Sequence, residues 1–149
     1  MKIFVGADYR GFERKGQLIK YLMELGYEVE DKGAYEYREG DDFNDAAINV
    51  ALAMRDEPGT MGALICDSAH GVTIQANRFK GIRAAHCNSV ESAKLAREHD
   101  DANVLCLSAH FTDETAMREI AKAFYETNFS NLERRVRRIN RLDEREDYA

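Results

Sequence analysis

The segment over residues 61–77, with the sequence MGALICDSAHGVTIQAN, constrains the fold of this chain most strongly. It opens with the apolar run Ala63-Leu64-Ile65, which is typical of a short buried strand. A polar loop over residues 67–71 follows directly after Cys66. Apolar residues then resume in the pattern expected of a helix, at Val72, Ile74 and Ala76. A buried strand that passes through a tight loop into a helix predicts an α/β unit.

The rest of the chain alternates in the same way between strand-like and helix-like segments. Strands are predicted over residues 3–5, 27–31, 61–66, 82–86 and 103–107. Helices are predicted over residues 10–25, 43–54, 71–81, 89–98, 112–127 (with Thr112 as its cap) and 131–145. This alternation is typical of a parallel sheet with helices on both faces. Ligands bind such sheets beyond the carboxyl ends of the strands, where the sequence places Asp8, Cys66, Cys87 and Ser108.

Composition limits the protein class. The 149 residues predict a single domain, 1–149, because they show no repeat or linker and can bury about 70% of the unfolded surface. A net charge of −6 argues against nucleic acid as a general partner. No apolar run approaches the roughly 20 residues of a membrane span, and the N-terminus lacks the layout of a signal peptide. Three cysteines without framework spacing fit a reducing cytoplasm.

The loop after Cys66 is the main candidate for chemistry. A helix start presents backbone N–H groups to an anion, and the same groups stabilise a thiolate. Backbone N–H groups that can bind an anion, next to a thiol that can act as a base, indicate enolate chemistry. The alternative reading is that Cys66 is a small apolar filler, as Cys87 and Cys106 are expected to be. No metal site is predicted, because Cys66 with His70 and His86 with Cys87 both lack a second ligand pair.

A set of short motifs extends over nearly the whole chain. They are Gly6-Ala7-Asp8, Gly11-Phe12, Gly26-Tyr27-Glu28-Val29, Leu64-Ile65-Cys66, Gly71, Ala76-Asn77, Lys80-Gly81-Ile82-Arg83-Ala84-Ala85, Leu95-Ala96-Arg97-Glu98-His99 and Ala102-Asn103-Val104-Leu105. In this order and spacing the set resembles the type B ribose-5-phosphate isomerases and the related galactose-6-phosphate isomerase subunits. The resemblance implies a three-layer α/β/α Rossmann-like sandwich with five parallel strands. It also implies a cofactor-independent aldose–ketose isomerase of sugar phosphates, with ribose 5-phosphate and ribulose 5-phosphate as the default pair.

The resemblance further implies a role for each matching residue. Cys66 would be the base that moves a proton between C1 and C2, with Ser68 assisting transfer between the oxygens. His99 would open the sugar ring from the partner subunit of a homodimer or dimer of dimers, with the tail, about 129–149, packed on that partner. Asp8 would hold sugar hydroxyls, and Arg137 would bind phosphate. The loop that would hold the enediolate through its N–H groups comprises Asp67, Ser68, Ala69, His70 and Gly71.

Departures from the family pattern concentrate in substrate recognition. A histidine is replaced by Tyr9, two arginines are replaced by His110 and Glu133, and the Cys-Gly-Thr-Gly loop becomes Cys66-Asp67-Ser68-Ala69. Asp67 would oppose formation of the Cys66 thiolate unless its side chain turns away. An anion site could be rebuilt by Tyr9, Arg10, His110 and Arg134. Two alternatives therefore stay open: an isomerase with a changed substrate (a tetrose phosphate, a hexose phosphate or an unphosphorylated sugar), and a non-catalytic binding protein or inactive subunit.

Three of these residues and segments also have purely structural interpretations. Asp8 is suited to cap the first helix, and His99 is suited to interact with the dipole at the end of its own helix. The arginine-rich tail, followed by acidic residues, is typical of a solvated helix with ion pairs. Those acidic neighbours and the lack of interleaved aromatic residues argue against an RNA-binding arm.

Overall fold

A computed structural model describes residues 1–144 and shows a five-stranded sheet with helices packed on both faces. All strand pairs are parallel, in the order β2-β1-β3-β5-β4. The strands are β1 (Lys2–Ala7), β2 (Glu28–Asp31), β3 (Met61–Cys66), β4 (Ala84–His86) and β5 (Val104–Ser108). The helices are α1 (Phe12–Glu24), α2 (Phe43–Asp56), α3 (His70–Ala76), α4 (Val90–Asp100), α5 (Glu114–Glu126) and α6 (Glu133–Asn140).

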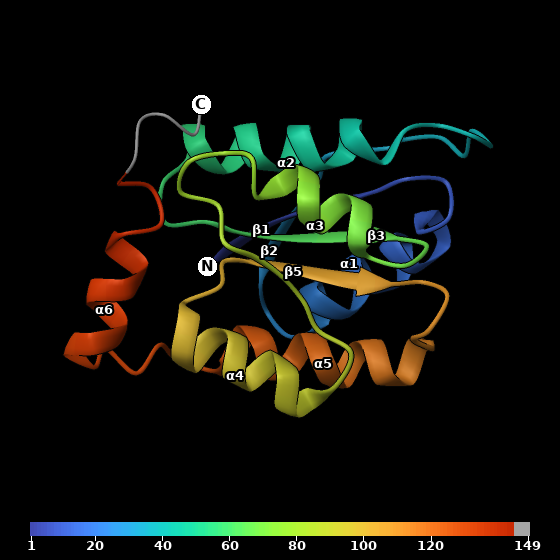
Figure 1. The fold of residues 1–149 in the computed structure, drawn as a ribbon. Coiled ribbons are helices and arrows are strands. Elements are labelled where there is room, and N and C mark those ends of the chain that lie inside the picture. Colours follow the sequence, from blue (N-terminus) through green and yellow to red (C-terminus); the bar gives the residue numbers. More distant parts are fainter. Residues whose placement is uncertain (145–149) are drawn as a thin grey trace.

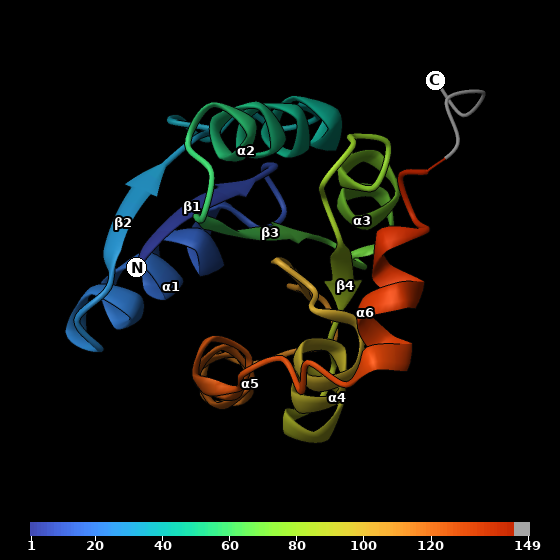
Figure 2. The ribbon, with the colours of Figure 1, turned by 90° about the vertical axis from the view of Figure 1, so that its left-hand side faces the viewer.

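The helices form two layers around the sheet, which confirms the predicted α/β/α sandwich. Helices α2 and α3 cover one face, while α1, α4 and α5 cover the other (Figures 1 and 2). Helix α6 lies outside these layers, beside α4 (Figure 2). None of the helices within residues 1–144 combines the length and the apolar character needed to cross a membrane.

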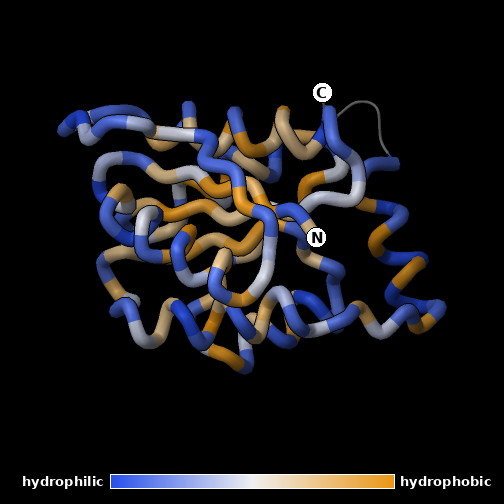
Figure 3. The backbone as a smooth tube through the Cα atoms, turned by 180° about the vertical axis from the view of Figure 1, so that it is seen from behind, coloured by the Kyte–Doolittle hydropathy of each residue, from blue (hydrophilic) through white to orange (hydrophobic). Residues whose placement is uncertain are grey.

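Successive side chains along the strands point to opposite faces of the sheet and belong to two apolar clusters, one on each face. Leu64, Cys66 and Val104 pack toward α2 and α3, whereas Ile65 and Leu105 pack toward α1, α4 and α5. All six residues of β3 are buried, because this strand lies in the centre of the sheet with helices on both sides. Hydrophobic residues accordingly gather along the central strands and hydrophilic ones line the outer segments (Figure 3).

Three helix boundaries differ clearly from the prediction. Helix α3 ends at Ala76 because the side-chain amide of Asn77 exchanges two hydrogen bonds with the backbone of Ala84, at 2.8 and 2.9 Å. The prediction of a helix to residue 81 is therefore wrong. Asp113, rather than Thr112, caps α5, since its carboxylate accepts the Ala116 N–H at 2.8 Å. The predicted tail helix over residues 131–145 is also too long, because α6 ends at Asn140 and residues 141–144 are not helical. Arg145, the last residue of that prediction, lies outside the described residues.

Candidate active site

Three neighbouring strands end side by side at one edge of the sheet, and this carboxyl edge carries most of the candidate site. The ends of β1 and β3 pair Ala7 with Ile65, and those of β3 and β5 pair Cys66 with Ser108. The loops that leave these strand ends bring together the predicted residues Asp8, Tyr9, Cys66, Asp67, Ser68, Ala69, His70, Gly71 and His110.

The loop after β5 fixes the loop after β3 by hydrogen bonds. The Ser108 hydroxyl, which is buried, donates to the carbonyl oxygen of Asp67 at 2.6 Å and accepts the Phe111 N–H at 3.0 Å. The His110 N–H donates to the same Asp67 carbonyl at 3.0 Å. This shared acceptor holds the chain after Cys66 in one position relative to the neighbouring strand.

Backbone geometry in the loop is tight. Ala69 is fully buried and has φ 70° and ψ −10°, the left-handed conformation that glycine adopts most readily. A Cβ atom at Gly71 would lie 2.8 Å from the ring of Phe43, so no side chain fits there. The chain therefore turns sharply from β3 into α3 and directs the first N–H groups of the helix back toward Cys66.

The Cys66 thiol experiences opposing effects. It is 4% exposed, and burial raises its pKa above the ordinary value. The N–H groups of Val72, Ala69 and Gly71 lower this pKa, while the charge of Asp8 raises it. Burial has the larger effect, so the pKa of the thiol lies above its ordinary value in the single chain, while the N–H groups that the sequence predicted beside the sulfur act in the opposite direction.

Asp8 is held at the end of β1 by the turn that precedes α1. Its Oδ1 atom accepts the N–H groups of Arg10 and Gly11 at 3.0 and 3.1 Å. Burial raises the pKa of this carboxyl, which is 7% exposed, and the same two N–H groups lower it. The structural reading of Asp8 is thus correct in part: it closes the turn before the helix, whose N-cap residue is Gly11.

The side chain of Asp67 extends toward the loop after β5. Its Oδ1 atom lies 3.7 Å from Nδ1 of His110. On the next residue, the hydroxyl of Ser68 accepts the His70 N–H at 3.4 Å.

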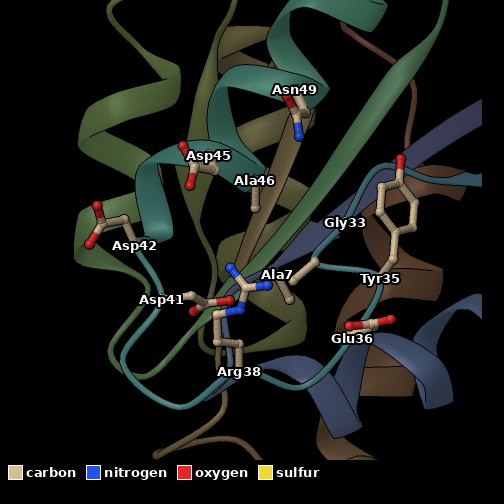
Figure 4. Close-up of a pocket in the computed structure, with 11 residues that line it drawn as sticks. Ala7, Gly33, Tyr35, Glu36, Arg38, Asp41, Asp42, Asp45, Ala46 and Asn49 are labelled. Carbon is tan, nitrogen blue, oxygen red and sulfur yellow. The ribbon is translucent and has the colours of Figure 1, made fainter.

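A cavity of about 410 Å³ opens at the same edge, between the ends of β1 and β2 and the start of α2 (Figure 4). Its walls carry four carboxylates and one guanidinium, with the side chains of Arg38 and Asp41 pointing toward the middle (Figure 4). Cys66 is not a lining residue. The polar and charged lining residues are Tyr35, Glu36, Arg38, Asp41, Asp42, Asp45 and Asn49.

Three predicted site residues lie at the opposite end of the molecule. His99 is in the last turn of α4, which returns from the carboxyl edge to the amino edge of the sheet. The residues Arg134 and Arg137 belong to α6, which is joined to the end of α4 by a bond from the Ser130 N–H to the Glu98 carbonyl at 3.1 Å. Figure 1 shows α6 on the side away from the arrowheads of β3 and β5. A single chain therefore does not bring these side chains to Cys66.

Two residues that shape the site were missed by sequence reasoning. Asp41 accepts the N–H of Tyr9 at 2.9 Å and ties the loop after β2 to the end of β1. Ser108 was placed at a strand end, but its role as an anchor of the Asp67 carbonyl was not foreseen. Contacts that span 32 and 41 positions leave no periodic signal in a sequence, so nothing in the pattern could have revealed them.

The other cysteines belong to the core, as predicted. Cys87 and Cys106 are fully buried, and burial raises the pKa of the first to about 11 and of the second to about 12. Among residues 1–144, no three histidine, cysteine, aspartate or glutamate side chains are grouped so that they could hold a metal ion.

Comparison with known proteins identifies the family. Residues 3–142 match the family described as Ribose/Galactose Isomerase. The chain belongs to this family. Two relatives in the ribose/galactose isomerase family are the ribose-5-phosphate isomerases B of Mycobacterium leprae and Escherichia coli. The first is 35% identical over 144 residues, covering 97% of this chain and 89% of that protein. The second is 35% identical over 146 residues, covering 97% of each.

Solved structures of ribose/galactose isomerases share the whole fold. Ribose-5-phosphate isomerase B from Mycoplasma genitalium, with bound ribulose-5-phosphate, is 34% identical with a TM-score of 0.93, covering 99% of this chain and 97% of that chain. The ribose 5-phosphate isomerase from Thermotoga maritima is 37% identical with a TM-score of 0.91, covering 97% of this chain and 98% of that chain. The resemblance stated from the sequence motifs is thereby confirmed.

Proposed function

We propose that the chain is an aldose–ketose isomerase of sugar phosphates that interconverts ribose 5-phosphate and ribulose 5-phosphate without a cofactor. Family membership and likeness to ribose-5-phosphate isomerases B over nearly the whole chain support this activity. The observation that carries the mechanism is the Cys66 thiol at the end of β3, facing the N–H groups of Ala69, Gly71 and Val72. A base next to preorganised donors is what proton transfer through an enediolate requires.

The proposed reaction moves one proton from C2 to C1 and a second proton from O2 to O1. The Cys66 thiolate removes the proton from C2 of the open-chain aldose, and the electron pair forms the enediolate. The resulting thiol returns the proton to C1, while the Ser68 hydroxyl passes a proton between O1 and O2. Loop N–H groups stabilise the oxyanion, and each such donor contributes about 3 kcal/mol to lowering a barrier. Asp8, fixed by the turn before α1, holds sugar hydroxyls.

The proposed enzyme is a dimer with shared sites. His99 and the α6 arginines lie at the amino edge, and Cys66 lies at the carboxyl edge. In a two-fold dimer with the subunits side by side and antiparallel, each edge faces the opposite edge of the partner, so His99 of the partner subunit reaches Cys66. Arg137 and Arg134 of the partner subunit would then bind the phosphate. Exposed apolar side chains on the helices around the edge strand β4 and beside α6 support this interface: Ile74, Leu95, Leu132 and Leu142.

The decisive experiment is isomerisation by purified protein with and without the thiol. Cys66→Ala should lose nearly all activity on ribose 5-phosphate, because the variant lacks the proposed acceptor of the C2 proton. Cys87→Ala removes a buried thiol that the mechanism does not use and is the matched control. Full activity in Cys66→Ala would refute the mechanism, and absence of activity in the wild type on a panel of sugar phosphates would refute the function.

We also propose that the enzyme acts in the cytoplasm, in the interconversion of pentose phosphates. Three free cysteines among the described residues fit a reducing compartment, where thiols stay unpaired. A thiol base needs such a compartment, because oxidation would remove the proton acceptor.

A further inference from the structure

The carboxylate of Asp67 lies at the rim of the candidate active site. The Asp67 Oδ1 atom is 3.7 Å from Nδ1 of His110, and both side chains are more than half exposed, at 55% and 61%. The main-chain bonds from Ser108 and His110 to the Asp67 carbonyl fix the backbone from which this carboxylate projects. Asp67 therefore remains beside the site rather than moving with a free loop.

The charge of Asp67 acts on the binding groups around it. The pKa of Arg10 is raised by the Tyr9 phenol first and then by Asp67, and the pKa of Asp8 is raised chiefly by burial, with a contribution from Asp67. Arg10 lies on the loop after β1 and His110 on the loop after β5, and the Asp67 carboxylate acts on Arg10 and lies 3.7 Å from His110. An anionic substrate competes with Asp67 for them.

The cavity at the same edge of the sheet is lined mainly by negatively charged side chains, like the loop that carries Asp67. Its walls carry the carboxylates of Glu36, Asp41, Asp42 and Asp45 against the single guanidinium of Arg38. This edge of the chain is thus electronegative before any partner supplies arginines. A doubly charged phosphate group is repelled by such a wall, whereas sugar hydroxyls donate hydrogen bonds to carboxylates.

We propose that Asp67 is a specificity-determining residue that weakens the preference of the site for a doubly charged sugar phosphate over the corresponding uncharged sugar. Its carboxylate lies 3.7 Å from the His110 ring and places a negative charge on the loop that follows Cys66. The proposal rests on the proposed function for the position of the substrate. Its primary test measures binding, so that it can fail separately from the catalytic assignment.

The test compares Asp67→Asn with wild type and with Asp56→Asn. Asparagine keeps the shape of the side chain and removes its charge. Asp56, at the end of α2 on the amino edge, is 69% exposed, so its substitution changes the net charge equally but far from the site. Inorganic phosphate and ribose 5-phosphate should bind Asp67→Asn about five- to tenfold more tightly at low salt, and ribose should bind equally to all three proteins.

Ionic strength provides a second readout. At about 1 M salt the Debye length is about 3 Å, so the tighter phosphate binding of Asp67→Asn should largely disappear if it arises from charge.

Asp67→Gly removes the side chain altogether and should shift the preference for phosphate over ribose in the same direction. It replaces Asp67→Asn in the test if that variant folds poorly. Unchanged or weaker phosphate binding in the folded variant, or an equal gain for ribose, would overturn the proposal. Loss of isomerase activity in all proteins would refute the proposed function instead.

Discussion

At the scale of single residues, the pKa of the Cys66 thiol depends on two opposing effects, hydrogen bonding and burial, whose relative size cannot be predicted from the sequence. The N–H groups at the start of α3 favour the Cys66 thiolate, as a strand–loop–helix junction predicts. Burial disfavours it more strongly and raises the pKa of the thiol, and the nearby charge of Asp8 adds to the rise. Nucleophilic or basic cysteines are active as thiolates, so the site holds its base mostly in the protonated form at neutral pH.

This balance predicts the pH dependence of isomerisation. In the proposed mechanism the thiolate is the active form, and its fraction grows about tenfold per pH unit below the pKa of the thiol. Because burial raises this pKa, kcat/KM for ribose 5-phosphate should still rise at pH 9 instead of levelling near pH 8. Initial rates from pH 6 to 10 would measure it. Cys87→Ala should keep the same profile, and a plateau reached below pH 8 would contradict the assignment of burial as the dominant influence.

At the scale of elements, two adjacent residues compete for one role at the start of α5. Thr112 and Asp113 are both good caps by residue type, and the periodicity of the helix does not distinguish them. The fold buries Thr112, at 6% exposure, and leaves Asp113 outside with its carboxylate on the Ala116 N–H. Packing of the preceding loop against the core therefore decides where the helix begins.

Removing the cap of α5 predicts a modest loss of stability. Asp113→Ala should lower the free energy of unfolding by about 1 kcal/mol, because the N–H group of Ala116 loses its acceptor. Asp113→Asn keeps a side-chain oxygen and should retain most of the stability. Urea unfolding at a fixed protein concentration would measure both. A loss as large in Asp113→Asn as in Asp113→Ala would show that the charge, and not the cap, matters.

At the scale of the whole molecule, the site residues divide between two ends. The carboxyl edge holds Cys66 and Asp8, and the amino edge holds His99 with the arginines of α6. Helix α6 has no buried residue in the single chain, although Val136 and Ile139 lie on it. An element with apolar side chains and no buried face is expected to gain its packing from another subunit.

Shared sites predict complementation between inactive variants. Cys66→Ala and His99→Asn should each be nearly inactive as homodimers. In a mixed dimer, one site combines the intact Cys66 of one chain with the intact His99 of the other. Random exchange of equal amounts makes half of the dimers mixed, so the mixture should recover about a quarter of wild-type activity. Activity that stays at the level of the separate variants after exchange would contradict sharing.

The fold class and the main candidate residues could be predicted from the amino-acid sequence. Apolar runs alternating with helical periodicity predicted the parallel sheet, and the strand–loop–helix segment at residues 61–77 predicted a thiol facing amide donors. These features are local, since each depends on neighbours within a few positions of the chain. They could therefore be read without coordinates, as could the burial of Cys87 and Cys106.

The contacts between these parts depend on tertiary packing and could not be predicted from the sequence. It turned Asp67 toward His110, joined Asp41 to Tyr9 and Ser108 to the Asp67 carbonyl, and separated Cys66 from His99. Each of these outcomes depends on residues far apart in sequence that meet because strands pair and helices pack. Burial also set the direction of the pKa shift of Cys66, because desolvation depends on everything that surrounds an atom.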